Sequence, residues 1–167
     1  MITETKKIEN LCFDFTEISI KKLFSELIQN PDGWILDLTS KFKRISQINL
    51  KEIEFFLNFC ANNNIIETLD DSYKLIGTKN SNIYFSDFCE YYFNLLFFDK
   101  RIYKNIFEKS TLSLENDFLI LDINSIEIKY RPLISSLSKI GFIEHKGDKA
   151  FIKNFLFAKR MLDRPLR

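Results

Sequence analysis

The feature that most constrains this fold is a helical pattern followed by a glycine and a hairpin pattern, within residues 128–152. Apolar residues recur at helical spacing from Pro132 to Ile140, and proline suits the first helical turn, where its missing N–H would have no partner. Gly141 comes just after the last apolar position, where helices often end through a left-handed residue. Two short apolar segments then flank the turn residues 146–148, which predicts a β-hairpin.

The same order of elements occurs earlier in the chain. Residues 49–63 predict a helix that starts at a capping box formed by Asn49 and Glu52. Asn64 follows it, and asparagine is the other residue that tolerates a left-handed conformation. A second hairpin pattern comes next, and matching residues lie at one constant offset of 77 positions, which predicts an internal duplication. The matches are Phe56, Leu57, Cys60, Asn64 and Glu67 with Leu133, Ile134, Leu137, Gly141 and Glu144.

Two further helices are expected before the first copy of this pattern. One starts at a cap on Thr16 or Ser19 and ends at Asn30, ahead of a strong turn signal. The other covers residues 34–42, with Trp34 among its inward-facing side chains.

The polar, turn-rich stretch after the first hairpin predicts a domain boundary. We expect a first unit over residues 11–77, a linker over 78–85 and a second unit over 86–157, followed by a basic tail over 158–167. Residues 1–10 are polar and are expected to be frayed or loosely attached.

The second unit carries most of the remaining expectations. Residues 86–98 and 99–109 predict two helices with more aromatic residues than one face can hold, which indicates burial on two sides. Residues 118–121 fit either a strand or a short helix, and residues 155–162 predict a final short helix.

The composition is that of an ordinary globular protein, with 46% hydrophobic and 28% charged residues. No secretory signal pattern and no apolar run of membrane-spanning length occurs, so we expect a cytoplasmic protein without membrane contact. The 3 cysteines are widely spaced in apolar settings, which predicts reduced core thiols.

Charge is distributed unevenly along the chain. The net charge is +1, but residues 1–127 hold 14 Lys and Arg against 20 Asp and Glu, whereas residues 128–167 hold 10 against 3. Any surface that faces phosphates should therefore lie in the last quarter of the chain. The basic end of the chain predicts a subunit that docks elsewhere or a piece cut from a longer protein.

The sequence offers no established catalytic pattern. The single histidine, His145, lies on a predicted strand, and no serine or cysteine stands in a nucleophile-elbow context. The three cysteines and one histidine lack the paired spacing of a metal site, and 4 glycines do not assemble a phosphate-binding loop. We expect no enzyme activity, no metal and no small-molecule cofactor.

The segment LISSLSKIGFIEHKGDKAFI, with its spaced leucines, glycine and short hairpin, resembles the end of a winged-helix domain. The resemblance in two copies implies a mainly α-helical α+β fold of two tandem winged helix-turn-helix units. The pattern is also similar to winged-helix repeats of bacterial restriction and phage-defence proteins, where they lie beside a nuclease or an ATPase. Winged-helix domains serve both DNA binding and protein assembly.

In winged-helix proteins that read DNA, the third helix enters the major groove and the hairpin contacts the backbone. The outward residues of that helix in the first copy include Glu52 and Glu54, which phosphates would repel, so this unit is expected to contact protein. The second copy is instead expected to contact duplex DNA through Lys129, Arg131, Ser135, Ser136, Lys139, Lys146, Lys149, Lys153, Lys159 and Arg160.

The leading hypothesis is a non-enzymatic subunit or module of a DNA-acting complex, with a larger assembly or a homodimer as its protein partner. A different class of function, a pure scaffold or adaptor without DNA contact, is the alternative. A transcription regulator is a third hypothesis, which a sequence-selective footprint would favour.

Overall fold

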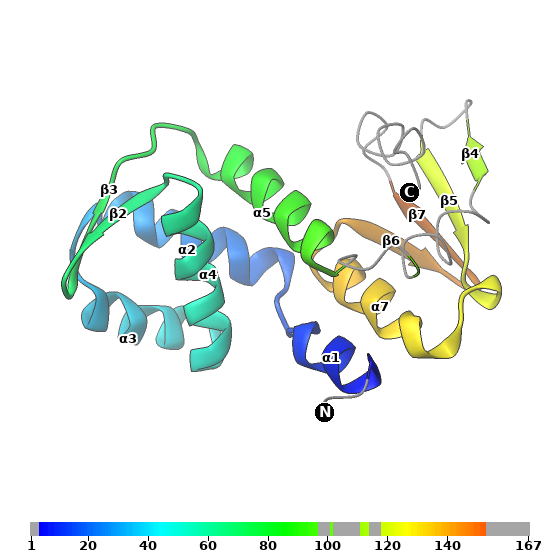
Figure 1. The fold of residues 1–167 in the computed structure, drawn as a ribbon. Coiled ribbons are helices and arrows are strands. Elements are labelled where there is room, and N and C mark those ends of the chain that lie inside the picture. The colour runs from blue at the N-terminus through cyan, green and yellow to red at the C-terminus, as the bar shows by residue number, and fades with distance from the viewer. Residues whose placement is uncertain (1–3, 97–100, 102–110, 114–117, 153–167) are drawn as a thin grey trace. The chain divides into compact units, whose positions relative to one another are not determined.

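Figure 1 shows the chain in a computed structural model, which describes residues 4–96, 101, 111–113 and 118–152. Two compact units are present: residues 14–90, here called the central unit, and residues 1–13 with 91–167, here called the terminal unit. Each unit combines helices with a small antiparallel sheet, so the predicted α+β class is confirmed.

The central unit contains a three-stranded antiparallel sheet of order β1-β3-β2. Of the two predicted caps of α2, Thr16 is the N-cap and Ser19 completes its capping box, and the predicted capping box of Asn49 with Glu52 is confirmed. The elements are α2 (Glu17–Gln29), β1 (Asp32–Trp34), α3 (Ile35–Ser46), α4 (Leu50–Asn62), β2 (Ile66–Leu69), β3 (Ser72–Leu75) and the first ten residues of α5 (Ser81–Leu96).

The helix α5 begins at Ser81, so the predicted start at Ser86 is wrong. Asn80 caps it instead: its side-chain oxygen accepts from the Ile83 N–H at 3.0 Å, and its carbonyl accepts from the Tyr84 N–H at 3.2 Å. The earlier start brings further aromatic residues of α5 into the central unit.

Phe88 of α5 lies at the centre of the aromatic core of the central unit. It is fully buried, and its ring meets Phe59 at 5.2 Å and Phe15 at 5.3 Å between centroids, both nearly edge to face. It also contacts Phe24 and Phe56, which belong to α2 and α4. The first half of α5 is therefore part of the same core as α2 and α4.

The terminal unit is built around a four-stranded antiparallel sheet of order β4-β5-β7-β6. Residues 118–121 lie in a strand, which settles the choice left open by their pattern. The elements are α1 (Glu4–Leu11), β4 (Thr111–Ser113), β5 (Phe118–Asp122), the 3-10 turns η1 (Ile123–Ser125) and η2 (Ile128–Tyr130), α7 (Arg131–Lys139), β6 (Ile143–Lys146), β7 (Lys149–Ile152) and the last turns of α5.

Residues 4–11 are neither frayed nor loosely attached, since they form α1. Ile8 is buried, α1 contacts α7, and the Tyr92 hydroxyl donates to the Leu11 carbonyl at 2.9 Å. The same hydroxyl accepts from the Phe13 N–H at 3.0 Å. Buried apolar contact and these hydrogen bonds hold a segment that composition alone marked as polar.

The two hairpins have the same register at an offset of 77 positions. Ile66 pairs with Leu75 as Ile143 pairs with Ile152, and every later pair follows in step. Both helices end in the same way: the Ile65 N–H donates to Cys60 and the Phe142 N–H donates to Leu137, each across a residue with positive φ. These residues are Asn64 and Gly141.

A third strand joins each hairpin on the same side, β1 beside β3 and β5 beside β7. Just beyond it, the Ile35 N–H donates to the Asp71 carbonyl and the Ile123 N–H donates to the Asp148 carbonyl, at 2.8 and 2.9 Å. Asp71 and Asp148 are again 77 positions apart. The predicted correspondence of the two segments is thus present in their backbone hydrogen bonds.

The expectation that Trp34 faces inward is wrong. Trp34 ends β1 opposite Ser72, and α3 starts only at Ile35. Tyr73, in the neighbouring row of the sheet, is buried, whereas Trp34 lies on the opposite face and is 61% exposed. The predicted helices over 99–109 and 155–162 lie outside the described residues, apart from Arg101, which is helical.

Candidate nucleic-acid interface

The short helix α7 carries the predicted interface and is fixed to the terminal unit along one face. Pro132 occupies its first turn, as expected, and Leu133, Ile134, Leu137 and Ile140 are buried. The opposite side of the helix exposes Ser135 and Lys139. The apolar spacing read from the sequence therefore identifies the buried face of α7 correctly.

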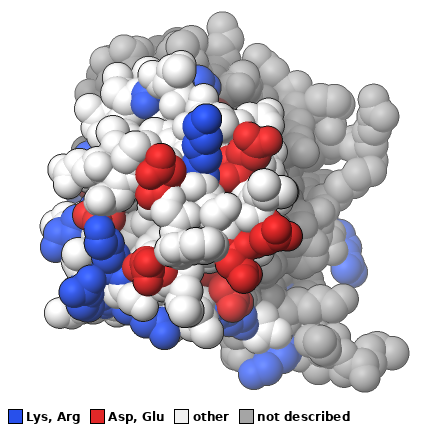
Figure 2. Space-filling view, turned by 90° about the vertical axis from the view of Figure 1, so that its left-hand side faces the viewer, with Lys and Arg blue, Asp and Glu red and all other residues white. Residues whose placement is uncertain are grey.

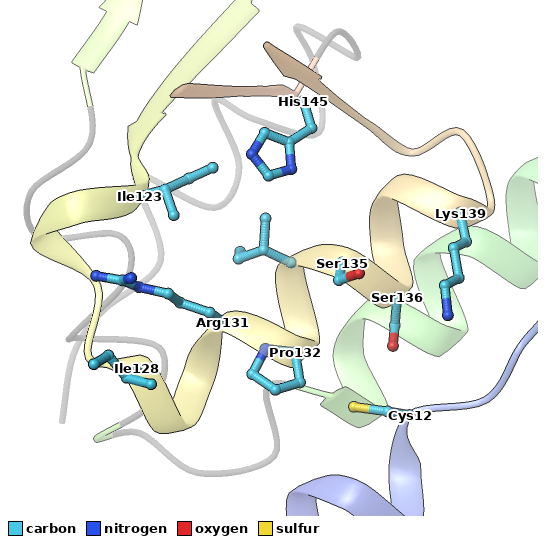
Figure 3. A pocket seen from close by; sticks show the side chains of 10 residues that line it. Cys12, Ile123, Ile128, Arg131, Pro132, Ser135, Ser136, Lys139 and His145 are labelled. Carbon is cyan, nitrogen blue, oxygen red and sulfur yellow. The ribbon is translucent and has the colours of Figure 1, made fainter. Parts of the chain in front are cut away.

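A cavity of about 530 Å³ lies beside α7. Figure 3 shows Arg131 and Lys139 at opposite ends of α7, and His145 reaching from β6 towards the same space. Ile128 of η2, also at the rim, is 77% exposed. The lining also includes Ile123, Pro132 and Ile134, so cationic side chains border a largely apolar hollow.

Lys129, just before α7, and Arg131, its first residue, are held by local contacts. Lys129 Nζ lies 3.5 Å from a Glu127 carboxylate oxygen and 5.0 Å from the centre of the Tyr130 ring. Arg131 is half-buried, and its Nε donates to the Ile126 carbonyl at 3.1 Å. The Arg131 side chain is thus anchored to the turn in front of the helix.

The hairpin contributes two exposed lysines. Lys146 and Lys149 pair directly across the β6–β7 ladder, and Lys146 Nζ lies 3.0 Å from a Glu144 carboxylate oxygen. On the other side of β7, Lys149 stands opposite Asp122 in the β5–β7 ladder. The His145 ring nitrogen Nε2 lies 3.1 Å from the Gly147 carbonyl, which fixes the ring over the turn.

The expectation that Ser136 faces outward is wrong, since only 3% of this residue is exposed. It follows Leu133 by one turn, and α1 packs against α7, so this helix is covered on more than one side. Glu52 in α4 was expected outward as well, but it is buried as part of its capping box. Lys153, Lys159 and Arg160 lie outside the described residues.

The shared register allows each cation to be compared with its counterpart in the central unit. The counterpart of Arg131 is Glu54, and the counterpart of Lys139 is Asn62. On the hairpin, the counterparts of Lys146 and Lys149 are Leu69 and Ser72. At four equivalent positions the terminal unit is thus cationic where the central unit is acidic or uncharged.

Sequence reasoning missed the cavity and its rim residues, Ile128 and His145. The periodicity of α7 gives its buried face but does not show that η2 turns Ile128 outward. The only sequence feature that pointed to an exposed apolar side chain here was Ile128 itself, which precedes a helix that starts with a proline.

The described residues contain no group of three or more His, Cys, Asp or Glu side chains placed to hold a metal ion. Cys60 and Cys89 are buried, and burial raises the pKa of both thiols, that of Cys89 to about 12. Such thiols stay protonated and chemically inert near neutral pH. Within the same part of the chain, every helix is too short or too polar to cross a lipid bilayer.

No protein-family model matches the chain, and no curated protein or solved structure matches it significantly.

Proposed function

We propose that both units are winged-helix domains and that the chain is a non-enzymatic module of a DNA-acting assembly. In this proposal the terminal unit contacts the DNA backbone through α7 and the β6–β7 hairpin, while the central unit contacts protein. The observation that carries the proposal is the difference in charge at equivalent positions of one repeated framework.

Phosphate contact fits the described side chains better than base reading does. Lysine and arginine make most contacts to phosphate oxygens, and such contacts set position without reading sequence. Ser135 lies on the exposed side of α7 between Arg131 and Lys139, and its short side chain permits close approach to a sugar-phosphate backbone. We therefore propose binding with little sequence preference.

Salt dependence tests this proposal directly. Each phosphate neutralised by a cation adds about 0.9 to the slope of log K against log salt concentration. The double variant Lys146→Glu with Lys149→Glu should therefore lower the slope measured on random duplex by about 2. Fluorescence anisotropy of a labelled duplex, read over a series of salt concentrations, gives this slope.

The matched control reverses two exposed lysines of the central unit, Lys22→Glu with Lys51→Glu, which changes the net charge by the same amount. Its slope should equal that of the unmodified chain. If both double variants lowered the slope equally, the effect would come from the overall charge and not from the hairpin. Unchanged binding in the hairpin variant would refute the DNA contact. Binding to no duplex at low salt would favour the scaffold function instead.

A further inference from the structure

An exposed apolar row crosses the sheet of the central unit. Trp34 and Leu69 both pair with Ser72, one from each side, so all three side chains lie on the same face. Trp34 is 61% exposed and Leu69 is 74% exposed. Leu36, in the first turn of α3, is 76% exposed, and the Ile35–Asp71 hydrogen bond holds this turn beside the β2–β3 turn.

Exposed carboxylates lie around this row. Trp34, Leu36, Leu69 and these carboxylates are together called the acidic-apolar face. Figure 2 shows this side of the molecule, with Asp and Glu side chains on several sides of an uncharged area and a Lys or Arg side chain between two of them. The carboxylates near the row come from the start of β1, the first turn of α3 and the β2–β3 turn, and the exposed Lys74 pairs with Asp32 on the same face of the sheet. The carboxylates are Asp32, Asp37, Asp70 and Asp71.

The buried Tyr73, on the opposite face of the sheet from Trp34, also lies in the field of nearby carboxylates. Its pKa is raised by burial and, after that, by the negative charges of Asp32, Glu26 and Asp37. Trp34 and Asp37 also border a cavity of about 370 Å³, whose lining includes the cations Lys41 and Arg44. A cationic partner would therefore find apolar area and favourable charge at the exposed row and its carboxylates, and not at this cavity.

The terminal unit presents the complementary surface. The cavity beside α7 is apolar at Ile123, Pro132 and Ile134, and the cations Arg131 and Lys139 stand at its rim. At about 530 Å³ it has room for an indole ring or a leucine side chain. One chain thus carries an exposed apolar projection with carboxylates and an apolar hollow with cations.

We propose that the acidic-apolar face of one copy docks into the α7 cavity of a second copy. The contact is heterologous, because different surfaces of the two copies meet, so repeated docking extends or closes a chain of copies. This inference rests on the proposed protein contact of the central unit and names the partner. Since the α7 surface is also the proposed DNA contact, duplex DNA should displace the second copy.

Two variants separate the halves of the contact. The face variant, Trp34→Ser with Leu69→Ser, removes the exposed apolar anchors, and the cavity variant, Ile128→Glu with Lys139→Glu, reverses the rim. All four side chains are exposed, so neither variant removes core packing. Sedimentation velocity of the full chain should show a mass that rises with concentration and falls with salt. Each variant alone should lose at least about tenfold in association, as truncation of a central aromatic anchor does.

Mixing the two variants gives the decisive result. Each retains the half that the other lacks, so an equimolar mixture should form one capped dimer. Trp34 is the single tryptophan of the chain, so only the cavity variant fluoresces strongly in the mixture, and its emission should shift to shorter wavelength. A matched control, Lys22→Glu with Lys51→Glu, should leave self-association unchanged.

A monomer at every concentration, or a mixture that stays monomeric, would overturn the docking. A Trp34 emission already shifted in the dilute monomer would also overturn it, because the face would then be covered within one copy. The salt slope on duplex DNA is measured separately on the face variant. On the face variant this slope should equal that of the unmodified chain. In the unmodified chain, DNA binding without self-association would refute this inference alone, whereas self-association without DNA binding would refute the proposed DNA contact alone.

Discussion

Replacement of Phe88 by alanine tests whether the first half of α5 belongs to the core of the central unit. The Phe88 ring is fully buried and meets five other aromatic rings within 6.5 Å between centroids. Deleting a buried phenylalanine ring typically costs about 3–5 kcal/mol, since both the transfer energy and the packing around the new cavity are lost. Edge-to-face ring pairs add about 0.5–1.5 kcal/mol each, although these terms overlap.

We therefore expect Phe88→Ala to lower the free energy of unfolding of the central unit by about 4 kcal/mol. Such a loss is a large part of the total stability of a small domain, which is about 5–15 kcal/mol. Urea unfolding followed by fluorescence measures it in this unit specifically, because the only tryptophan, Trp34, lies in β1. Far-ultraviolet circular dichroism of the same samples reports the helices of the whole chain.

Phe85→Ala is the matched control, because it removes the same ring from the same helix. Phe85 is half-buried, with Lys21 Nζ at 5.1 Å from the ring centre, so its loss should cost about 1 kcal/mol. Equal losses in the two variants, or a loss below about 1.5 kcal/mol for Phe88→Ala, would refute the assignment of α5 to this core.

Two further predictions concern the turn after α7 and the buried thiol of the central unit. Gly141 has a φ of 79°, so Gly141→Ala should destabilise the β6–β7 hairpin by about 1 kcal/mol, measured by amide hydrogen exchange. Gly141→Asn should cost less, because Asn64 adopts this conformation at the equivalent position; equal costs would contradict this account. Burial, with Glu17 adding to it, raises the pKa of Cys89 from 9.0 to about 12. The folded state holds this proton more tightly, so stability should be full below pH 9.0 and fall towards pH 12. In Cys89→Ala the free energy of unfolding, measured with urea, should fall less between pH 9.0 and pH 12. An equal fall in the variant would refute the assignment of this pH dependence to Cys89.

The sequence predicted helix ends and hairpins well, but it predicted less well which segments pack together in the core of each unit. The helix stops at Asn64 and Gly141 and both hairpins follow from short-range rules about turns and left-handed residues. The capping boxes at Thr16 and Asn49 likewise involve only residues three positions apart. Such features are readable because the groups that stabilise them are close in the sequence.

The errors came from contacts between distant segments. Residues 1–10 looked polar, yet α1 packs on α7, which lies far along the chain. Trp34 fitted the apolar pattern of a helix, but pairing with Ser72 places it in a strand and exposes it. In each case a partner far away in the sequence decided the outcome, and periodicity carries no information about that partner.

The candidate site was predicted in part. Ser135, Lys139, Lys146 and Lys149 are exposed around α7 and the hairpin, as expected, whereas Ser136 is buried. A helix of nine residues covered on more than one side leaves a narrow exposed strip, narrower than an amphipathic pattern suggests. The role of these residues in DNA binding stays a prediction.

Photocrosslinking from equivalent positions tests the central claim, that one framework occurs twice and only its second copy contacts DNA. Ser135 and Asn58 are both exposed, lie on equivalent helices and are 77 positions apart. A photoreactive amino acid placed at either position, with random duplex at low salt, samples the same point of each copy. Crosslinks from position 135 alone are predicted. Crosslinks from both positions, or from position 58 alone, would contradict the account.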